Sequence, residues 1–171
     1  LPEKPYAVSG VAQAGNAVPL CTQTITYTSF QRPSTIEENG VTASFTYNSA
    51  YDRVKMSVSK DGQNILTRHY LGGCYELDEK PSSSVEKLYL LGDYYDAPMV
   101  LVKDEASDTI YQIGRDILGS VMLVISPNGS KEKLSFDAWG RLRNPVGHKV
   151  YAPGEEPELF LGRGYTGHEH L

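Results

Sequence analysis

The sequence predicts an all-β protein in which antiparallel strands follow one another along the chain as hairpins in a meander. Three observations support this fold class: apolar and polar residues alternate with a period of two, turn dipeptides separate the alternating stretches, and a short aromatic–Arg pattern recurs. A 3.6-residue apolar period of helical length is not found in any window. We therefore expect hairpins and no long helix.

The alternation is clearest in two neighbouring stretches. In residues 41–47, Val, Ala, Phe and Tyr alternate with Thr and Ser, and in residues 53–60, Val54, Met56 and Val58 alternate with Lys and Ser. A strand places successive side chains on opposite faces, so each stretch has one apolar and one wet face. This pattern is typical of an antiparallel sheet that is buried on one side.

Turn dipeptides separate the predicted strands. Asn39-Gly40, Asp61-Gly62 and Asn128-Gly129 each lie between two strand-like stretches. Asn-Gly and Asp-Gly tolerate the positive φ angles of tight hairpins, so we expect three tight hairpins here. The strands are then expected at 34–38, 41–47, 53–60, 63–70, 74–77, 85–91, 99–103, 109–113, 120–125 and 131–136. We expect one turn of helix at 116–118.

These elements suggest three segments. Residues 1–21 are rich in Ala, Gly, Val and Pro and are expected to form a linker or an irregular first strand. Residues 22–143 form the antiparallel β domain. Residues 144–171 are rich in Pro and Gly, and we expect a tail that is extended, packed on a sheet or poorly ordered. Its residues 145–167 are expected to fold back over one sheet edge and partly protect it.

Composition excludes several functional classes. The net charge is −5 and the basic residues are scattered from Lys4 to Arg163, which argues against a nucleic-acid surface. No apolar run approaches the length that spans a bilayer. The chain starts at Leu1 without Met, so we expect a part of a longer chain or a processed product. Cys21 and Cys74 either form a disulfide or are two buried thiols.

The recurring pattern reads aromatic, polar, small, aromatic, variable, Arg. It is found in residues 27–32 and 136–141, and residues 47–53 match it with one inserted residue. We expect the aromatic residues Tyr27, Tyr47, Phe136 and Trp139 to be largely buried at strand ends. The Arg residues are expected to contact backbone carbonyls or aromatic rings; they are Arg32, Arg53 and Arg141.

Three stretches resemble the rearrangement-hot-spot (RHS) and YD-repeat family. Residues 136–141, Phe-Asp-Ala-Trp-Gly-Arg, resemble the YD-repeat signature Tyr-Asp-Ala-x-Gly-Arg. Residues 115–120, Arg-Asp-Ile-Leu-Gly-Ser, are similar to the Arg-Asp-His-Leu-Gly-Ser segment of the RHS-associated core. Residues 163–171 are similar to the segment that usually follows it, and Gln31 and Asp52 stand where the family favours Gly.

The resemblance implies a curved β-ribbon that is part of an RHS shell enclosing a C-terminal toxin or effector. It implies secretion or a bacterial cell-surface location. The partners would be the remainder of the parent chain, shell and cargo. The family's aspartyl self-cleavage site lies downstream of the residues present here. For the chain by itself we expect a monomer or a weak edge-paired dimer.

The most obvious candidate for a metal site is His168-Glu169-His170. Two His residues separated by one residue point to the same side of a strand, and Glu155, Glu156 or His148 would have to supply a third ligand. The spacing is not the His-Glu-x-x-His of helical zinc proteases. We interpret the triplet as a polar tail segment, and His69 as a residue on a sheet face.

A second candidate is Asp93-Tyr94-Tyr95-Asp96, where two carboxylates flank two aromatic rings, as in sugar-binding and glycosidase sites. Gly92 and Pro98 flank it as they would a plain turn. Ser120 lies outside any Gly-x-Ser-x-Gly nucleophile motif. The sequence therefore predicts no catalytic residue, no metal site and no cofactor, and it assigns no ligand-binding residue. The alternative to a structural shell segment is a carbohydrate- or cell-surface-binding β module.

Overall fold

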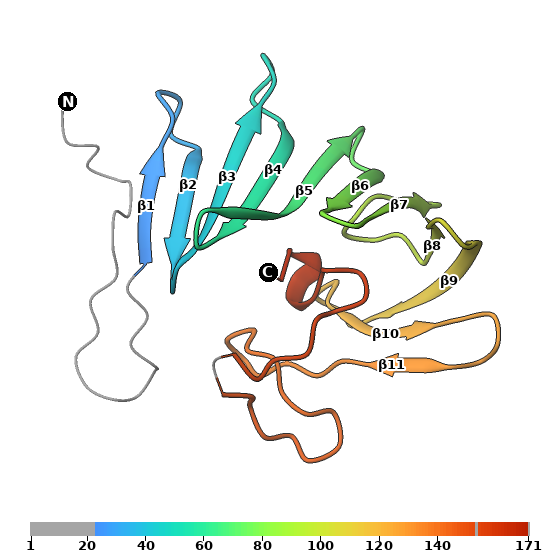
Figure 1. Ribbon diagram of the computed structural model, residues 1–171. Coiled ribbons are helices and arrows are strands. Elements are labelled where there is room, and N and C mark those ends of the chain that lie inside the picture. Colours follow the sequence, from blue (N-terminus) through green and yellow to red (C-terminus); the bar gives the residue numbers. More distant parts are fainter. Residues whose placement is uncertain (1–22, 153, 171) are drawn as a thin grey trace. The chain divides into compact units, whose positions relative to one another are not determined.

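The computed structural model describes residues 23–152 and 154–170, and it confirms the all-β antiparallel fold (Figure 1). Within these residues, eleven strands form one sheet and are hydrogen-bonded in chain order, from β1 to β11. The strands are β1 Gln23–Tyr27, β2 Pro33–Glu38, β3 Val41–Tyr47, β4 Arg53–Lys60, β5 Gln63–Leu71, β6 Tyr75–Lys80, β7 Ser83–Leu90, β8 Met99–Lys103, β9 Asp108–Arg115, β10 Val121–Ile125 and β11 Lys131–Lys133. The segment predicted at residues 1–21 lies outside the described residues, and so does Cys21.

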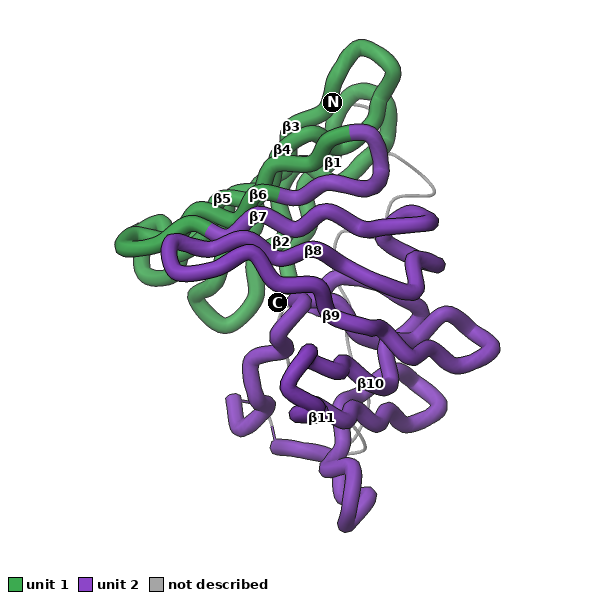
Figure 2. The backbone as a smooth tube through the Cα atoms, turned by 90° about the vertical axis from the view of Figure 1, so that its right-hand side faces the viewer, with its two compact units in different colours: residues 1–71, 77–84 green, residues 72–76, 85–171 purple. Residues whose placement is uncertain are grey.

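The chain divides into two compact units, which are described separately (Figure 2). Unit 1 comprises residues 1–71 and 77–84, and unit 2 comprises residues 72–76 and 85–171. The helical content of the described residues is one 3-10 turn, η1, at Tyr165–Gly167. None of the described helices is long and apolar enough to cross a membrane.

The core of unit 1 lies on the apolar face that the alternation predicts. Ala43, Met56 and Val58 are buried, and neighbouring strands contribute partly buried side chains to the cluster: Val41, Phe45, Leu66 and Tyr70. Ala43 is directly opposite Val58 in the register of β3 and β4, so their side chains share one face. The guanidinium of Arg53 lies 4.5 Å from the centre of the Phe45 ring, which confirms its predicted aromatic contact.

Two of the three predicted tight turns have the expected geometry. Asn39 and Gly40 have φ of 52° and 76°, and Asp61 and Gly62 have φ of 50° and 77°. Two successive positive φ angles match the right-handed twist of the flanking strands. These dipeptides therefore close the β2–β3 and β4–β5 hairpins as predicted.

The third turn is wider than predicted. Ile125 pairs with Lys131, so five residues, 126–130, form the loop, and of Asn128-Gly129 only Gly129 has a positive φ, at 85°. The N–H of Ser126 donates to the carbonyl of Ser130 at 3.0 Å, and the N–H of Gly129 donates to the carbonyl of Ser126 at 2.9 Å. A G1-bulge type of loop needs one positive φ, which Gly129 supplies.

The same two hydrogen bonds recur in four other five-residue segments, three of which lie in the aromatic–Arg repeats, and we call this unit a YD corner. In each, the N–H of the first residue donates to the carbonyl of the fifth, and the N–H of the fourth donates to the carbonyl of the first. The fourth residue has a positive φ. The five corners are residues 28–32, 48–52, 116–120, 126–130 and 137–141.

The corner geometry corrects the predicted alignment of the repeats. Residues 48–52 match residues 137–141 with no inserted residue, because Tyr51, with a φ of 65°, occupies the position of Gly140. Gln31 stands at the Gly position as predicted, whereas Asp52 does not. Residues 116–118 form part of a corner and not a helical turn, since Asp116 receives the N–H of Gly119.

The prediction that Trp139 is buried is wrong, because its side chain is 83% exposed. Trp139 is the third residue of its corner, and its N–H is held by the Asp137 carboxylate at 2.9 Å while the side chain projects outward. Phe136, which precedes the corner, is buried as predicted, and Tyr27 and Tyr47 are half-buried. Arg141 pairs with the carboxylate of Asp137 and not with a carbonyl or a ring.

The sheet of unit 2 continues beyond β11 only as isolated bridges. β11 ends at Lys133, three residues earlier than predicted, and is followed by the bridges Phe136↔Leu142 and Arg143↔Val150. The tail packs on the sheet, which is one of the predicted alternatives, and the prediction that it covers a sheet edge is wrong. It lies on the face of the sheet, where Leu159 and Leu161 are buried and the N–H of Val121 donates to the carbonyl of Gly164 at 3.0 Å. Figure 1 shows this red segment next to β10.

Candidate functional site

The C-terminal segment is held on the sheet of unit 2 by a buried ion pair. Arg163 donates from Nε to Oε1 of Glu76 at 3.0 Å, and its Nη2 also bonds to this oxygen. The two side chains are 3% and 0% exposed. Removing either charge would leave the other buried without its partner, so the pair is a strong positional constraint.

The remaining polar atoms of this pair also have partners. Nη1 of Arg163 donates to the carbonyl of Gly167 at 3.0 Å, and the hydroxyl of Tyr89 donates to Oε2 of Glu76 at 3.2 Å. The guanidinium lies 4.5 Å from the centre of the Tyr94 ring. Burial works to lower the pKa of Arg163, but the carboxylate of Glu76 outweighs it, and the pKa is above its ordinary value. Arg163 is therefore a permanent cation inside unit 2.

Two further contacts attach the C-terminal segment to β7 and to the corner before β10. The buried Lys87 donates from Nζ to the carbonyl of Leu161 at 3.2 Å. The N–H of Thr166 donates to Oγ of Ser120 at 3.0 Å, and Ser120 is itself fully buried. Lys87 and Ser120 thus both serve as anchors for the backbone of the tail.

Arg115, the first residue of the RHS-like segment 115–120, binds carbonyls beside the C-terminal segment. It donates to the carbonyls of Gly119 at 2.8 Å, Tyr94 at 3.0 Å and Ala97 at 3.3 Å. Burial lowers the pKa of Arg115, and the nearby Arg163 acts in the same direction. Arg115 joins one YD corner to the loop that contains Tyr94.

Close packing explains the glycines of the Gly-Tyr-Thr-Gly segment. A Cβ on Gly164 would lie 2.9 Å from Cζ of Phe136, which real Cβ atoms do not tolerate. Gly167 has a φ of 71°, and a Cβ there would lie 3.1 Å from the Tyr95 ring. The segment therefore passes over aromatic side chains at a distance that only glycine allows.

The structure does not bring the predicted metal-ligand candidates into one site. His168 Nδ1 is 2.6 Å from Oγ1 of Thr166, and its ring lies 5.8 Å from that of Tyr95. His170 lies beside Phe136, with ring centres 6.4 Å apart. Burial lowers the pKa of His170, against a smaller opposing effect of Glu156. Among residues 23–152 and 154–170, no group of three His, Cys, Asp or Glu side chains could hold a metal ion.

The carboxylates of the Asp93–Asp96 segment cap its own turn. Oδ1 of Asp96 accepts the N–H of Asp93 at 2.8 Å, and Oδ1 of Asp93 accepts the N–H of Tyr95 at 2.7 Å. Tyr94 is buried against Arg163, and Tyr95 is 47% exposed. Both carboxylates thus have a local structural use. His69 lies on the face of β5 as predicted, with Nε2 3.0 Å from Oε2 of Glu79.

Sequence reasoning missed Glu76, Lys87 and Tyr89 as members of a site. Glu76 and Arg163 are 87 positions apart, and no local pattern joins them. One signal in the sequence could have indicated this site. Lys87 lies two residues before Tyr89 in a predicted strand, so a charged side chain shares a strand face with an aromatic one.

Comparisons with known proteins show a likeness of fold alone. No family model matches the chain, and no curated protein matches it. Among solved structures, the chain is similar to TcdB2-TccC3-TEV with a TM-score of 0.64 and 12% identity over 86% of this chain. It is similar to TcdB2-TccC3 and to TcdB2-TccC3-Cdc42 with TM-scores of 0.58 and 11% identity over 85% of this chain. The chain spans 8% of the length of each of these chains.

Proposed function

We propose that this chain is a non-catalytic structural segment of an RHS-type shell, secreted or displayed at a bacterial surface. The observation that carries the proposal is a meander of hairpins joined by recurring YD corners, with a C-terminal segment pinned on one sheet face by the buried Arg163–Glu76 pair. The likeness to much longer chains supports a role as part of a wall. The wall would enclose a C-terminal cargo, as the RHS resemblance implies.

Electron cryomicroscopy of the natural full-length protein would test this function. We expect further hairpins paired to β1, and a closed wall in which unit 2 is embedded. A cargo inside this wall should resist protease until the wall is opened. A free-standing domain joined to its neighbours by linkers would contradict the proposal.

A carbohydrate- or cell-surface-binding module is the second candidate, and one observation favours it. The Trp139 ring is 83% exposed, and a bare aromatic face is the usual platform for a sugar ring. A glycan array run with the wild type and with Trp139→Ala would test it. Glycan binding by the wild type that is lost in Trp139→Ala would support the carbohydrate-binding module. If no glycan binds the wild type, this second candidate is rejected and the structural shell segment is retained.

The absence of catalysis and of a bound metal belongs to the same proposal. The carboxylates of Asp93 and Asp96 are engaged by backbone N–H groups, and His168 and His170 have different neighbours. Elemental analysis of the purified protein should find no stoichiometric zinc. Stoichiometric zinc that is lost in both His168→Ala and His170→Ala would contradict this part of the proposal.

A further inference from the structure

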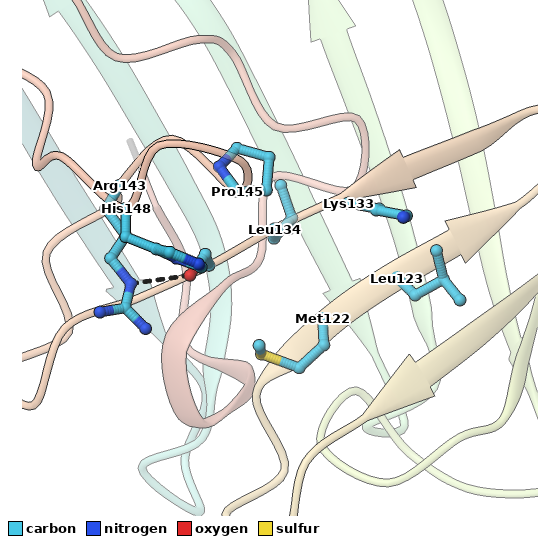
Figure 3. Close-up of a pocket in the computed structure, with 8 residues that line it drawn as sticks. Met122, Leu123, Lys133, Leu134, Arg143, Pro145 and His148 are labelled. Atoms are coloured by element: carbon cyan, nitrogen blue, oxygen red, sulfur yellow. Dashed lines mark hydrogen bonds between the residues drawn. The ribbon is translucent and has the colours of Figure 1, made fainter.

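A groove opens in unit 2 where the chain leaves the outer edge of β11 (Figure 3). It is a shallow, open groove with a volume of about 420 Å³. Met122, Leu123 and Leu134 form its apolar part, and Lys133, Arg143 and His148 also line it. The apolar and basic side chains come from β10, from β11 and from the chain that follows β11.

The register of the sheet explains why the groove is open. Phe136 pairs with Leu142, and the N–H of Arg143 donates to the carbonyl of Ser135 at 2.9 Å. Continuing this register by two residues places Pro145 opposite Lys133. Proline has no N–H, so it cannot continue the ladder, and the chain diverges at this point.

The divergence leaves the backbone of Lys133 exposed on the outer edge. The N–H of Leu134 donates to the carbonyl of Met122 at 2.9 Å, so Leu134 faces β10. In an antiparallel ladder the adjacent residue directs its N–H and C=O the other way, and Lys133 therefore directs both toward Pro145. No residue in the described part of the chain bonds to these groups. An open edge of this kind can accept an added strand.

The charge of the groove selects the partner. Arg143 uses Nε to bond to Oγ of Ser135 at 2.7 Å, and within residues 23–152 and 154–170 its two Nη groups have no bond (Figure 3). Lys133 is exposed, and His148 adds an imidazole. None of the described residues that line the groove is acidic, although the whole chain carries a net charge of −5. Carboxylates are the natural counterions for a forked guanidinium and an ammonium.

We propose that this groove binds an extended peptide segment in which acidic and apolar residues alternate. The peptide adds a strand to the outer edge of β11 and pairs its backbone with Lys133. Its carboxylates lie on the face of the sheet that carries Lys133 and Arg143. Its apolar side chains lie on the opposite face, beside Leu134 and Met122. This binding is independent of the proposed shell role and would also operate in a free-standing domain.

Fluorescence anisotropy with a labelled, end-capped peptide of about six residues, alternating Glu and Val, would test the proposal; such a peptide spans roughly 20 Å. Lys133→Gln and Arg143→Gln should each weaken binding by up to about five-fold, and added salt should weaken it further. Lys149→Gln makes the same charge change at an exposed neighbour outside the groove and should have no effect. Lys133 has no side-chain bond to a described residue, so its variant should fold normally.

Three further measurements complete the test. A peptide that alternates Gln and Val should bind more weakly, and the Glu–Val peptide N-methylated at the amides that face β11 should not bind. Equal binding of the Gln peptide, or an equal effect of Lys149→Gln, would overturn the acidic specificity. Unchanged binding of the methylated peptide would overturn the added strand. Competition by inorganic phosphate that abolishes all peptide binding at low millimolar concentration would show a simple anion site and also overturn the proposal.

Discussion

At the residue scale, three of the YD corners in the described residues are held by one Asp or Asn side chain at their first position. In residues 137–141, Oδ1 of Asp137 accepts the N–H groups of Trp139 and Arg141, both at 2.9 Å. Oδ2 accepts from Nε of Arg141 at 2.6 Å. Asn48 and Asp116 hold two N–H groups of their own corners in the same way. Asx side chains stabilise turns through such bonds.

Asp137→Ala should therefore lower the free energy of unfolding by about 1–2 kcal/mol, as loss of a helix cap does. Asp137→Asn keeps an oxygen for the two N–H groups and should recover most of this loss. Trp139→Ala in the same corner should change stability by less than about 0.5 kcal/mol, since the ring is exposed. Urea unfolding of the three variants would measure this. A larger loss for Trp139→Ala than for Asp137→Ala would contradict the corner model.

The Arg163–Glu76 pair leads to a larger expected effect. Arg163→Gln or Glu76→Gln should each lower the free energy of unfolding by about 3–5 kcal/mol, because a buried charge then loses its partner. The double variant should lose less than the sum of the two single changes. Arg141→Gln, which breaks an exposed ion pair, should cost about 1 kcal/mol or less. Additive losses in the double variant would show that the two side chains do not interact.

At the element scale, the C-terminal segment combines glycines that permit close approach with polar groups that bind the strands. Gly164 and Gly167 bring its backbone against Phe136 and Tyr95. Arg163 and Lys87 then supply directional contacts that apolar packing alone lacks. Sliding the segment by one residue would place a Cβ where Gly164 stands, so its register is strongly specified.

The stability of this segment should depend on pH through His170. Burial lowers the folded-state pKa of His170 below its ordinary value of 6.5. As the pH falls, His170 is therefore protonated in the unfolded chain before it is protonated in the folded chain. Stability is then greatest above about pH 6.5 and falls as the pH decreases through this value toward the folded-state pKa. Thermal unfolding from about pH 8 to pH 5 should show a drop that His170→Gln reduces. His69→Gln is the matched control, and an equal reduction there would contradict the assignment.

At the scale of the whole molecule, the meander connects each strand mainly with its sequence neighbours. The strand order equals the chain order, so a local change should spread along the sheet only through adjacent hairpins. The C-terminal segment is the exception, because it contacts strands of unit 2 that are far away in sequence.

Hydrogen exchange followed by mass spectrometry should detect this organisation. In Arg163→Gln, amide protection should fall in residues 85–90 of β7, in β8–β10 and in residues 159–167, which lie in unit 2. Protection in β3 and β4, whose Ala43–Met56–Val58 core does not involve Arg163, should remain close to that of the wild type. A uniform loss of protection over both units would indicate a single cooperative block.

The sequence by itself determined the features that depend on neighbouring residues. The bounds of β3, β4 and β8 match the prediction at both ends, and the turns at Asn39-Gly40 and Asp61-Gly62 have the expected backbone angles. Period-two alternation and positive-φ dipeptides act over a few residues, so they can be read from a short stretch. The aromatic–Arg repeat also identified the location of three YD corners and the alignment of two of them, whereas the inserted residue predicted in residues 47–53 is wrong.

Only the tertiary structure decided which side chains are buried and which distant residues meet. Trp139 looks like a core residue by type, but its place in the corner directs it to solvent. Glu76 and Lys87 look like surface residues, but the tail covers them. The tail position depends on contacts between residues separated by 74 and 87 positions, and chain geometry over such distances is set by packing and not by local propensity.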